Sequence, residues 1–285
     1  MKKALFVIPL IVVAVALAIW FFSPTRLPVR FAEATDPPID FARLEQELPL
    51  TIEEREALMP EVFEKLSQEQ VDQIYGRLTA GVIPDGAFDG DLLFPRGSDG
   101  ETLLAEILGG RLKSRLGDIS VRKTEFLGRT LWKGKVFYRQ QGLLRNRIED
   151  LTILAPVISG SIRDIEKLDV DGRDAYLLFP ARVHCGQSLL DGRRESIVID
   201  YAFTDELPGY REAPDALAGR NGLRIRDEIR MIRPGFYLGR AYMNRVFALN
   251  FTIYNDDLAS EGLEDFRAGR TAEECWSGTQ VVARH

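Results

Sequence analysis

The chain has 285 residues, a hydrophobic share of 45% and a formal net charge of -6 at pH 7. This acidic balance argues against a nucleic-acid surface, which would normally be basic, although it does not exclude a cationic partner. The hydrophobic share is ordinary for a globular protein that buries a core.

The amino terminus is the first informative segment. Lys2 and Lys3 precede an uncharged apolar run from Ala4 to Phe22. The run is long enough to cross a bilayer, because a spanning helix needs roughly 20 apolar residues. A cleaved secretory signal is the alternative, but its apolar core is usually only about 7–15 residues long. We therefore expect a transmembrane signal anchor over residues 1–22, with a periplasmic or otherwise extracytoplasmic body.

A proline-rich stretch follows the apolar run. Residues 23–40 include Pro24, Pro28, Pro37 and Pro38. Proline fixes φ and removes a backbone donor, so this stretch is typical of an extended tether.

The next region, residues 41–118, is expected to form a helical segment packed on the rest of the protein. Thr51 with Glu54, and Ser67 with Gln70, have the spacing of capping boxes. These boxes predict helices over 52–65 and 68–79, and a third helix is expected over 101–116.

The pattern changes to β-strands after about residue 119. Asp-Gly pairs are strong hairpin signals, because both residues of the turn can adopt positive φ. Asp171-Gly172 separates 167–170 from 175–179, and Asp191-Gly192 separates 184–190 from 196–203. Two further strands are expected over 236–243 and 246–254. The predicted fold is therefore α+β: a membrane helix, a short helical segment, and a predominantly antiparallel β-barrel over 119–285 with a C-terminal helix or tail. Closure into a barrel is economical because it removes exposed strand edges.

The clearest alternation lies in residues 223–231. Side chains two apart share a face of a strand, so Arg224, Arg226, Glu228 and Arg230 are expected to meet water. The inward face would carry Leu223, Ile225, Asp227, Ile229 and Met231.

Asp227 would interrupt an otherwise apolar inner face. If the hairpin at Pro234-Gly235 is symmetric, Asp227 lies opposite Tyr242, and Ile229 lies opposite Arg240. The predicted ligand site comprises Asp227, Arg240, Tyr242, Ile225, Ile229 and Met231. Alternatively Asp227 belongs to an internal ion pair or is exposed by a bulge, because a buried carboxylate needs a partner for structural reasons alone.

Short motifs suggest a family. Trp132-Lys133-Gly134-Lys135-Val136-Phe137 follows the glycine-rich block from Gly81 to Gly90, and Asp227-Glu228-Ile229-Arg230 and Leu238-Gly239 come later. Together they partly match, and resemble, uncharacterised small-barrel families named for a Gly-x-Trp-x-Gly motif. The resemblance implies a lipocalin-like or calycin-like barrel that binds an apolar small molecule. Trp132, Gly134 and Lys135 would then have structural roles, with Trp132 and Lys135 closing the floor of the barrel.

The two cysteines, Cys185 and Cys275, are expected to form a disulfide if the body is exported, and to be two buried thiols otherwise. His184 and Cys185 are adjacent in a predicted strand and therefore point to opposite faces, so they do not suggest a catalytic pair. Asp85, Asp89 and Asp91 lack the spacing of an EF-hand and are interpreted as a polar turn. No catalytic residue, metal or cofactor is predicted.

Three classes of function follow. The leading hypothesis is a membrane-anchored envelope protein whose barrel binds a lipid-like or other hydrophobic small molecule. The second is an enzyme acting on a hydrophobic substrate, with Asp227, Arg240 and Tyr242 as an acid/base cluster. The third is an interaction scaffold with a filled barrel. The protein partner and the oligomeric state are not predicted.

Overall fold

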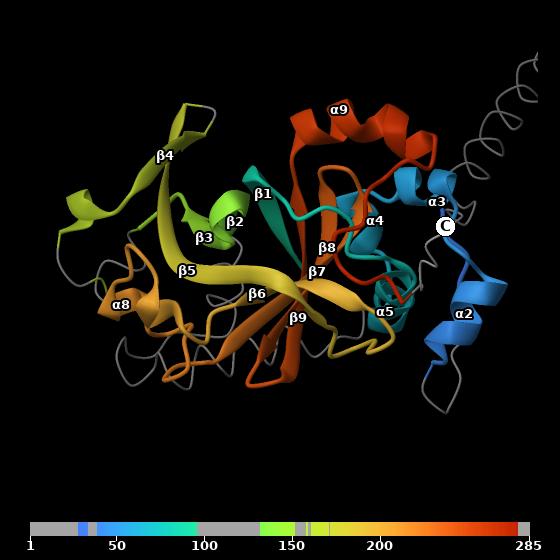
Figure 1. Ribbon diagram of the computed structural model, residues 1–285, viewed down its shortest axis with the longest axis horizontal. Helices are drawn as coiled ribbons and strands as arrows, with labels where there is room; N and C mark the ends of the chain where they lie inside the picture. The colour runs from blue at the N-terminus through green and yellow to red at the C-terminus, as the bar shows by residue number, and fades with distance from the viewer. Residues whose placement is uncertain are drawn as a thin grey trace, which may run out of the picture.

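The architecture is an antiparallel β-barrel with a few helices, seen in the computed structural model (Figure 1). The structure describes residues 28–33, 39–95, 132–151, 158, 161–170 and 172–278. The strands are β1 (Gly86–Leu93), β2 (Trp132–Tyr138), β3 (Leu143–Ile148), β4 (Lys167–Val170), β5 (Arg173–Gln187), β6 (Glu195–Asp200), β7 (Ile225–Arg233), β8 (Phe236–Met243) and β9 (Val246–Tyr254).

The order of the strands closes the sheet on itself. The order is β3-β2-β1-β9-β8-β7-β6-β5-β4, and an additional β3–β5 pairing joins the ends of eight strands into a ring. The remaining strand, β4, pairs with β5 and forms a hairpin outside the ring. The α+β class and the antiparallel barrel are thus confirmed.

The helices are α2 (Phe41–Glu47), α3 (Ile52–Ala57), α4 (Pro60–Phe63), α5 (Gln68–Arg77), α8 (Glu212–Asp215) and α9 (Asp256–Arg267). Short 3-10 turns are η1 (Arg139–Gln141), η3 (Ile162–Asp164) and η4 (Thr204–Glu206). Both predicted capping boxes are formed, at Thr51 and at Ser67. The helix expected over 52–65 is instead two helices, because Pro60 starts a new helix at a position where it needs no backbone donor.

Other expectations fall outside the described residues or differ in their bounds. The expected anchor (1–22) and third helix (101–116) lie outside the described residues. In the described part of the chain, no helix combines the length and hydropathy that crossing a membrane requires. The first strand of the barrel begins at Gly86, well before the expected boundary at 119, and it includes Asp89 and Asp91. The interpretation of those two residues as part of a polar turn was therefore wrong.

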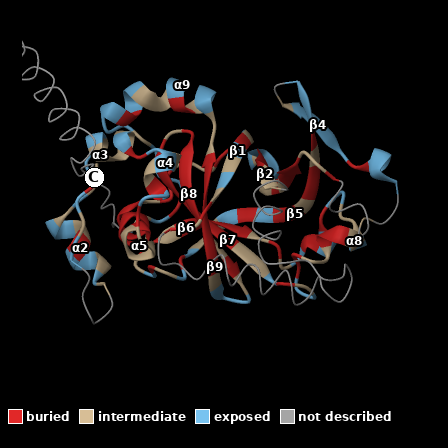
Figure 2. Ribbon diagram, turned by 180° about the vertical axis from the view of Figure 1, so that it is seen from behind, coloured by how far each residue is buried: buried red, intermediate tan, exposed pale blue. Residues whose placement is uncertain are grey.

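The inner face of the barrel is largely filled by apolar side chains. Buried residues concentrate on the barrel strands and α5, whereas much of α9 and the hairpin of β4 are exposed (Figure 2). The interior core includes Phe88, Phe137, Ile197, Ile229, Met231, Tyr237 and Ile253.

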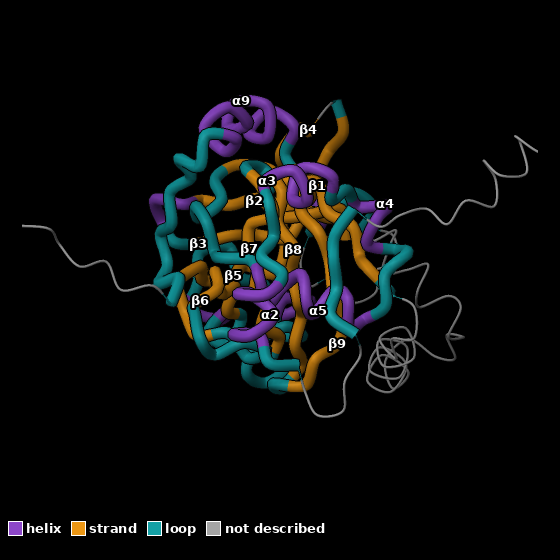
Figure 3. Tube along the Cα trace, turned by 90° about the vertical axis from the view of Figure 1, so that its right-hand side faces the viewer, coloured by secondary structure: helices purple, strands orange, loops and turns teal. Residues whose placement is uncertain are grey.

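Helices α2 to α5 lie on one side of the barrel (Figure 3). A second core joins them to the outer wall of the barrel, where Leu58, Phe63, Leu66, Ile74 and Leu78 pack with Ile232, Phe236 and Leu238. This layer overturns part of the expectation that the outward side chains of 223–231 meet water. Glu228 and Arg230 are fully buried beneath it, whereas Arg224 is exposed and Arg226 is half-buried. Arg230 donates to Ser196 Oγ (3.0 Å) and to Asp191 Oδ2 (3.1 Å).

The register of the β7–β8 hairpin also differs from the symmetric one. Asp227 lies opposite Ala241, and Ile229 lies opposite Gly239. The pairing shifts between Met231 and Arg233, so Ile232 is an extra residue in β7. A bulge of this kind moves every later partner by one position and places it on the opposite face.

One end of the barrel is covered by two segments that are distant in sequence. Residues before β1 pass across this end, where Tyr237 Oη donates to the Val82 carbonyl (2.7 Å). The C-terminal tail lies beside them, and Glu274 N donates to the Gly81 carbonyl (3.1 Å). The interior core therefore extends to Ala80 and Cys275 at this end.

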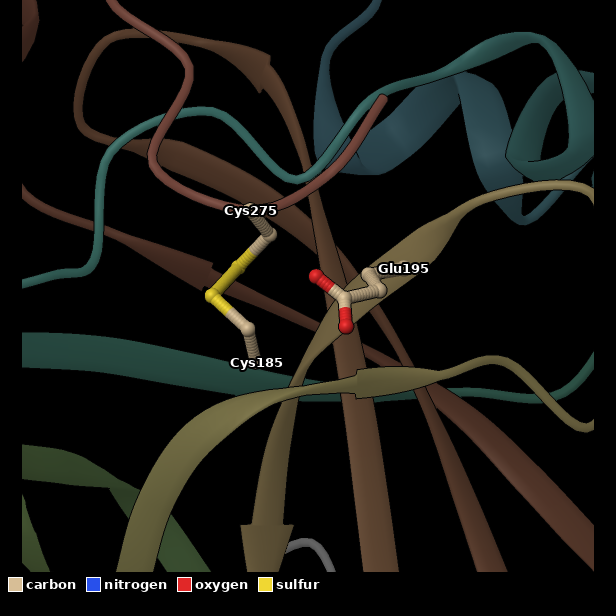
Figure 4. A group of neighbouring side chains, drawn as sticks. All are labelled: Cys185, Glu195 and Cys275. Atoms are coloured by element: carbon tan, nitrogen blue, oxygen red, sulfur yellow. A yellow bond between two sulfur atoms is a disulfide. The ribbon is translucent and has the colours of Figure 1, made fainter. Parts of the chain in front are cut away.

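The predicted disulfide is present and holds the tail in place. Cys185 on β5 and Cys275 are bonded (Figure 4), with Cα atoms 5.3 Å apart. Trp276 N donates to Glu195 Oε2 (2.9 Å) on the neighbouring strand, so the tail is secured by both a covalent bond and a hydrogen bond.

Candidate functional site

A buried polar cluster lies inside the barrel. Lys135 on β2 is 2% exposed and Asp227 on β7 is 5% exposed. Lys135 Nζ donates to Asp227 Oδ2 (2.9 Å), to Tyr201 Oη (2.9 Å) and to Asn146 Oδ1 (3.0 Å). An ammonium has three N–H donors, and these contacts use all of them. Trp132 Nε1 donates to the same Asn146 oxygen (2.9 Å).

A bulge in β2 makes this arrangement possible. Residues three apart in a regular strand point to opposite faces, yet Trp132 and Lys135 both contact Asn146. The pairing with β3 shifts between Trp132 and Gly134, leaving one extra residue in β2. Gly134 has φ +138°, and a Cβ there would overlap the Phe88 carbonyl oxygen, so this position favours glycine.

A second bulge brings the backbone of β5 to the cluster. Asn146 Nδ2 donates to Tyr201 Oη (2.9 Å) and to the Phe179 carbonyl (3.2 Å). Phe179 has φ +53°, which is uncommon for an aromatic residue. Its N–H donates to Oδ1 of Asp215 (2.7 Å), a fully buried residue at the end of α8. Burial raises the pKa of Asp215, while the N–H groups of Phe179 and Arg211 oppose that rise.

The cluster keeps its lysine protonated. Burial alone would lower the pKa of Lys135, but the nearby Asp227 and Tyr201 outweigh it, and the pKa is raised above its usual 10.5. Burial raises the pKa of Tyr201 to about 12. At neutral pH the cluster is therefore a Lys–Asp ion pair with a neutral phenol. A protonated lysine is not a nucleophile, and its three donors are engaged by Asn146, Tyr201 and Asp227.

Aromatic rings surround the ammonium group. Lys135 Nζ lies 5.5 Å from the centroid of Trp132, 5.3 Å from Phe251 and 5.6 Å from Tyr201. These distances are within the range of about 6 Å at which a cation is attracted to an aromatic face.

The cluster lies toward the end of the barrel opposite the disulfide-linked tail. At this end β1 stops, β2 and β7 begin, and β8 stops. Apolar side chains that pack on the interior core are only half-buried here, namely Leu92, Phe94, Trp132, Ile225 and Met243. We call these five residues the apolar rim. They lie next to the polar cluster, whereas the other end contains both buried apolar residues such as Ala80 and half-buried ones such as Ile83 and Leu258.

The predicted ligand residues divide between two faces. Asp227, Ile229 and Met231 are buried in the interior with Ile225 half-buried beside them, as expected. Arg240 and Tyr242 are not on this face, because the bulge at Ile232 reverses their orientation. Arg240 is instead paired with Asp72 of α5 and donates to Tyr242 Oη (3.0 Å). The expected grouping of Asp227, Arg240 and Tyr242 is therefore wrong.

Two members of the cluster were missed in the sequence. Neither Asn146 nor Tyr201 belongs to a clear motif; Asn146 lies 11 residues after Lys135, whereas Tyr201 lies 66 residues after it. Pairing between neighbouring strands brings them to the cluster. Lys135 pairs with Asn146 across β2–β3, and Asp227 pairs across β6–β7 with Ile199, which is two residues before Tyr201.

The other candidate groups have different roles. Cys185, Cys275 and Glu195 form a group close enough to hold a metal ion, but the two sulfur atoms are bonded to each other and provide no thiolate. His184 is exposed next to Cys185, and its ring nitrogen Nδ1 contacts the Cys185 carbonyl (2.8 Å) rather than its sulfur.

Comparisons with known proteins do not identify a family. No family model and no curated protein matches the chain. A solved structure described as "Crystal structure of protein from Thermomonospora curvata" is 18% identical, with a TM-score of 0.36. The match covers 72% of this chain and 98% of that chain. A likeness this distant says nothing about what the present chain binds. Of the predicted calycin-like resemblance, the closed antiparallel barrel is the part that the structure supports.

Proposed function

We propose that the protein is a membrane-anchored envelope protein whose barrel binds a hydrophobic small molecule carrying a polar group. One observation carries the proposal: the Lys135–Asp227 cluster lies below a rim of half-buried apolar side chains. Ligand sites in proteins are mostly apolar and contain a few placed polar groups that fix orientation. The apolar rim would contact the hydrophobic part of the ligand, and the cluster would receive its polar group.

The test removes the polar cluster while keeping the barrel folded. Removing one member of a buried ion pair leaves the other charge uncompensated, whereas replacing both with apolar residues is often neutral. We expect the double variant K135M/D227L to lose most co-purified ligand that bears a polar group. The matched control is K167M/D174L, which replaces an exposed Lys–Asp pair on the hairpin of β4. Mass spectrometry of co-purified small molecules measures how much ligand each variant carries, with the variants compared at equal abundance in the membrane. Thermal unfolding checks that each variant is folded. Equal occupancy in both double variants would contradict the proposal.

The location is a separate part of the proposal. The apolar run from Ala4 to Phe22 supports an anchor, and the Cys185–Cys275 disulfide fits an oxidising compartment. We expect the mature chain to be recovered uncleaved in the membrane fraction. Intact-mass measurement and fractionation test this, and a soluble product beginning near Ile19 or Thr35 would contradict it.

An interaction scaffold is the second candidate. It is favoured by the buried apolar residues that fill the end near the disulfide, and by the complete use of the Lys135 donors within the protein. A scaffold would yield no co-purified small molecule, and its protein complex would survive K135M/D227L. The enzymatic alternative loses its proposed acid/base cluster, because Arg240 and Tyr242 lie on the outer face.

A further inference from the structure

The C-terminal tail, residues 268–278, lies across one end of the barrel with few buried side chains to hold it there. This stretch follows α9 and contains neither a helix nor a strand. Cys275 is its one buried residue, and its neighbours Glu273, Glu274 and Trp276 are exposed. Because burial of apolar surface is the main term that favours a packed arrangement, the tail gains little of it apart from Cys275.

The other contacts of the tail are polar and lie near the surface. Gly81 N donates to Glu273 Oε2 (2.9 Å), and Ile83 N donates to Glu274 Oε2 (2.7 Å). Glu274 is also paired with Arg139, whose side chain is 42% exposed. Exposed ion pairs contribute little to stability, because water competes for both charges. These contacts therefore define the position of the tail more than they hold it.

The disulfide is the covalent connection between the tail and the barrel wall. It joins Cys275 to Cys185 on β5, so this part of the tail cannot leave while the bond is intact (Figure 4). The next residue along the tail pairs with β6, since Trp276 N donates to Glu195 Oε2 (2.9 Å) and Glu195 N donates to the Trp276 carbonyl (2.9 Å). Both hydrogen bonds require that Cys275 stays beside the wall.

The two cysteines differ in their access to solvent. Cys185 is half-buried beside the exposed His184, whereas Cys275 is 6% exposed. Thiol–disulfide exchange begins when a thiolate attacks an accessible sulfur. A dithiol reductant would attack Cys185 Sγ, form a mixed disulfide with it and release Cys275. Its second thiol would then displace Cys185. Two electrons and two protons pass to the cysteines, and the dithiol becomes a disulfide.

We propose that the Cys185–Cys275 bond is a redox switch, and that its reduction by a dithiol releases the tail from residue 271 onward while the barrel stays folded. The segment before β1 stays in place, because Met231 N donates to the Thr79 carbonyl (2.9 Å) and Tyr237 Oη donates to the Val82 carbonyl (2.7 Å). Ala80 and Cys275 belong to the same core, so release exposes apolar surface at this end. The switch lies away from the polar cluster and does not depend on the proposed ligand.

The first experiment asks whether Cys275 stays buried without its bond. C185S leaves Cys275 as the single thiol, and the matched variant C275S leaves the half-buried Cys185. We expect iodoacetamide to alkylate Cys275 in folded C185S within roughly tenfold of its rate in urea that unfolds the chain, because a segment with few buried contacts opens readily. A slower reaction overturns the proposal. Failure of Cys185 to react in folded C275S also overturns it, because a reductant could not reach that sulfur.

The second experiment is hydrogen exchange of the full chain in detergent, resolved to single amides, before and after treatment with dithiothreitol. We expect the amides of Gly81, Ile83 and Trp276, whose acceptors are Glu273, Glu274 and Glu195, to exchange roughly tenfold faster after reduction. The Met231 amide is the internal control, because its acceptor lies outside the tail.

The variant C185S/C275S separates release of the tail from other effects of the reductant. It should exchange as the reduced chain does, and dithiothreitol should not change it further. Unchanged exchange at the tail after reduction would show that the tail stays bound. Equal acceleration at Met231 would show that the whole barrel loosens instead. Either result overturns the proposal.

Discussion

Lys135 is the residue on which the interior cluster depends, because its ammonium donates to the side chains of Asn146, Tyr201 and Asp227. K135M alone would leave the Asp227 carboxylate buried without a cation. Breaking a buried pair in this way costs about 3–5 kcal/mol. We expect the free energy of unfolding to fall by this amount, and to be largely restored in K135M/D227L. Urea denaturation of the single and double variants measures both values. If the loss in the double variant equals the sum of the losses in the single variants, Lys135 and Asp227 are not energetically coupled and the prediction is wrong.

The same cluster predicts a loss of stability at alkaline pH. The pKa of Lys135 is raised above 10.5 in the folded protein, so its contribution is present below about 10.5 and is lost as pH rises through the folded value. Tyr201 acts in the same direction, because its pKa rises from 10 to about 12. The unfolded chain releases these protons first, which favours unfolding as pH increases.

We therefore expect the free energy of unfolding to decrease between pH 10 and pH 12. A shift of this size in Tyr201 corresponds to roughly 2–3 kcal/mol. The measurement is urea denaturation across this range, with Y201F as the comparison. An equally steep decline in Y201F would exclude Tyr201 as a contributor.

At the scale of elements, the bulge in β2 decides which side chains enter the barrel. At Gly134, β2 lies against the backbone of β1, and an added Cβ would overlap the Phe88 carbonyl oxygen. We expect G134A to destabilise the protein by more than the approximately 1–2 kcal/mol of an unfavourable positive φ alone. The matched control is G86A, because Gly86 also has a positive φ, of +85°, but no heavy atom lies within 4 Å of an added Cβ.

Chemical denaturation of G134A and G86A measures the difference between them. Trp132 fluorescence provides a second measurement, because G134A should displace the indole from its hydrogen bond to Asn146. Equal stability of the two variants would show that the close approach of β1 and β2 is not required.

For some helices and hairpins, a short sequence pattern was enough to predict the structure. The capping boxes at Thr51 and Ser67 start their helices at the predicted residues, because the contacts that define them span only three positions. The β4–β5 hairpin forms at Gly172 for a similar reason. The β7–β8 register could not be predicted from a local pattern, because Ile232 forms a bulge and packs against the helical layer.

At the scale of the whole molecule, the disulfide joins the C-terminal tail to the barrel wall across 90 residues of sequence. A crosslink that closes a loop of this length stabilises a fold by about 4–5 kcal/mol on the chain-entropy model. We expect C185S/C275S to unfold at lower urea concentration by a corresponding amount. The unaltered chain in reductant should behave like the variant, and an unchanged midpoint would contradict this role.

Several properties of this protein were determined by the sequence itself. The change from helical to β patterns, the inward orientation of Asp227 and the pairing of the two cysteines follow from local periodicity and composition. The tertiary structure decided the rest, because it depends on contacts between distant segments. Lys135 meets Asp227 across 92 positions of sequence. Arg230 is buried between α5 and the residues around β6, where it donates to the Tyr75 carbonyl and to Ser196. A one-residue bulge moves Arg240 and Tyr242 to the outer face. A strand pattern identifies two faces, but packing determines what covers each face and which register aligns its partners.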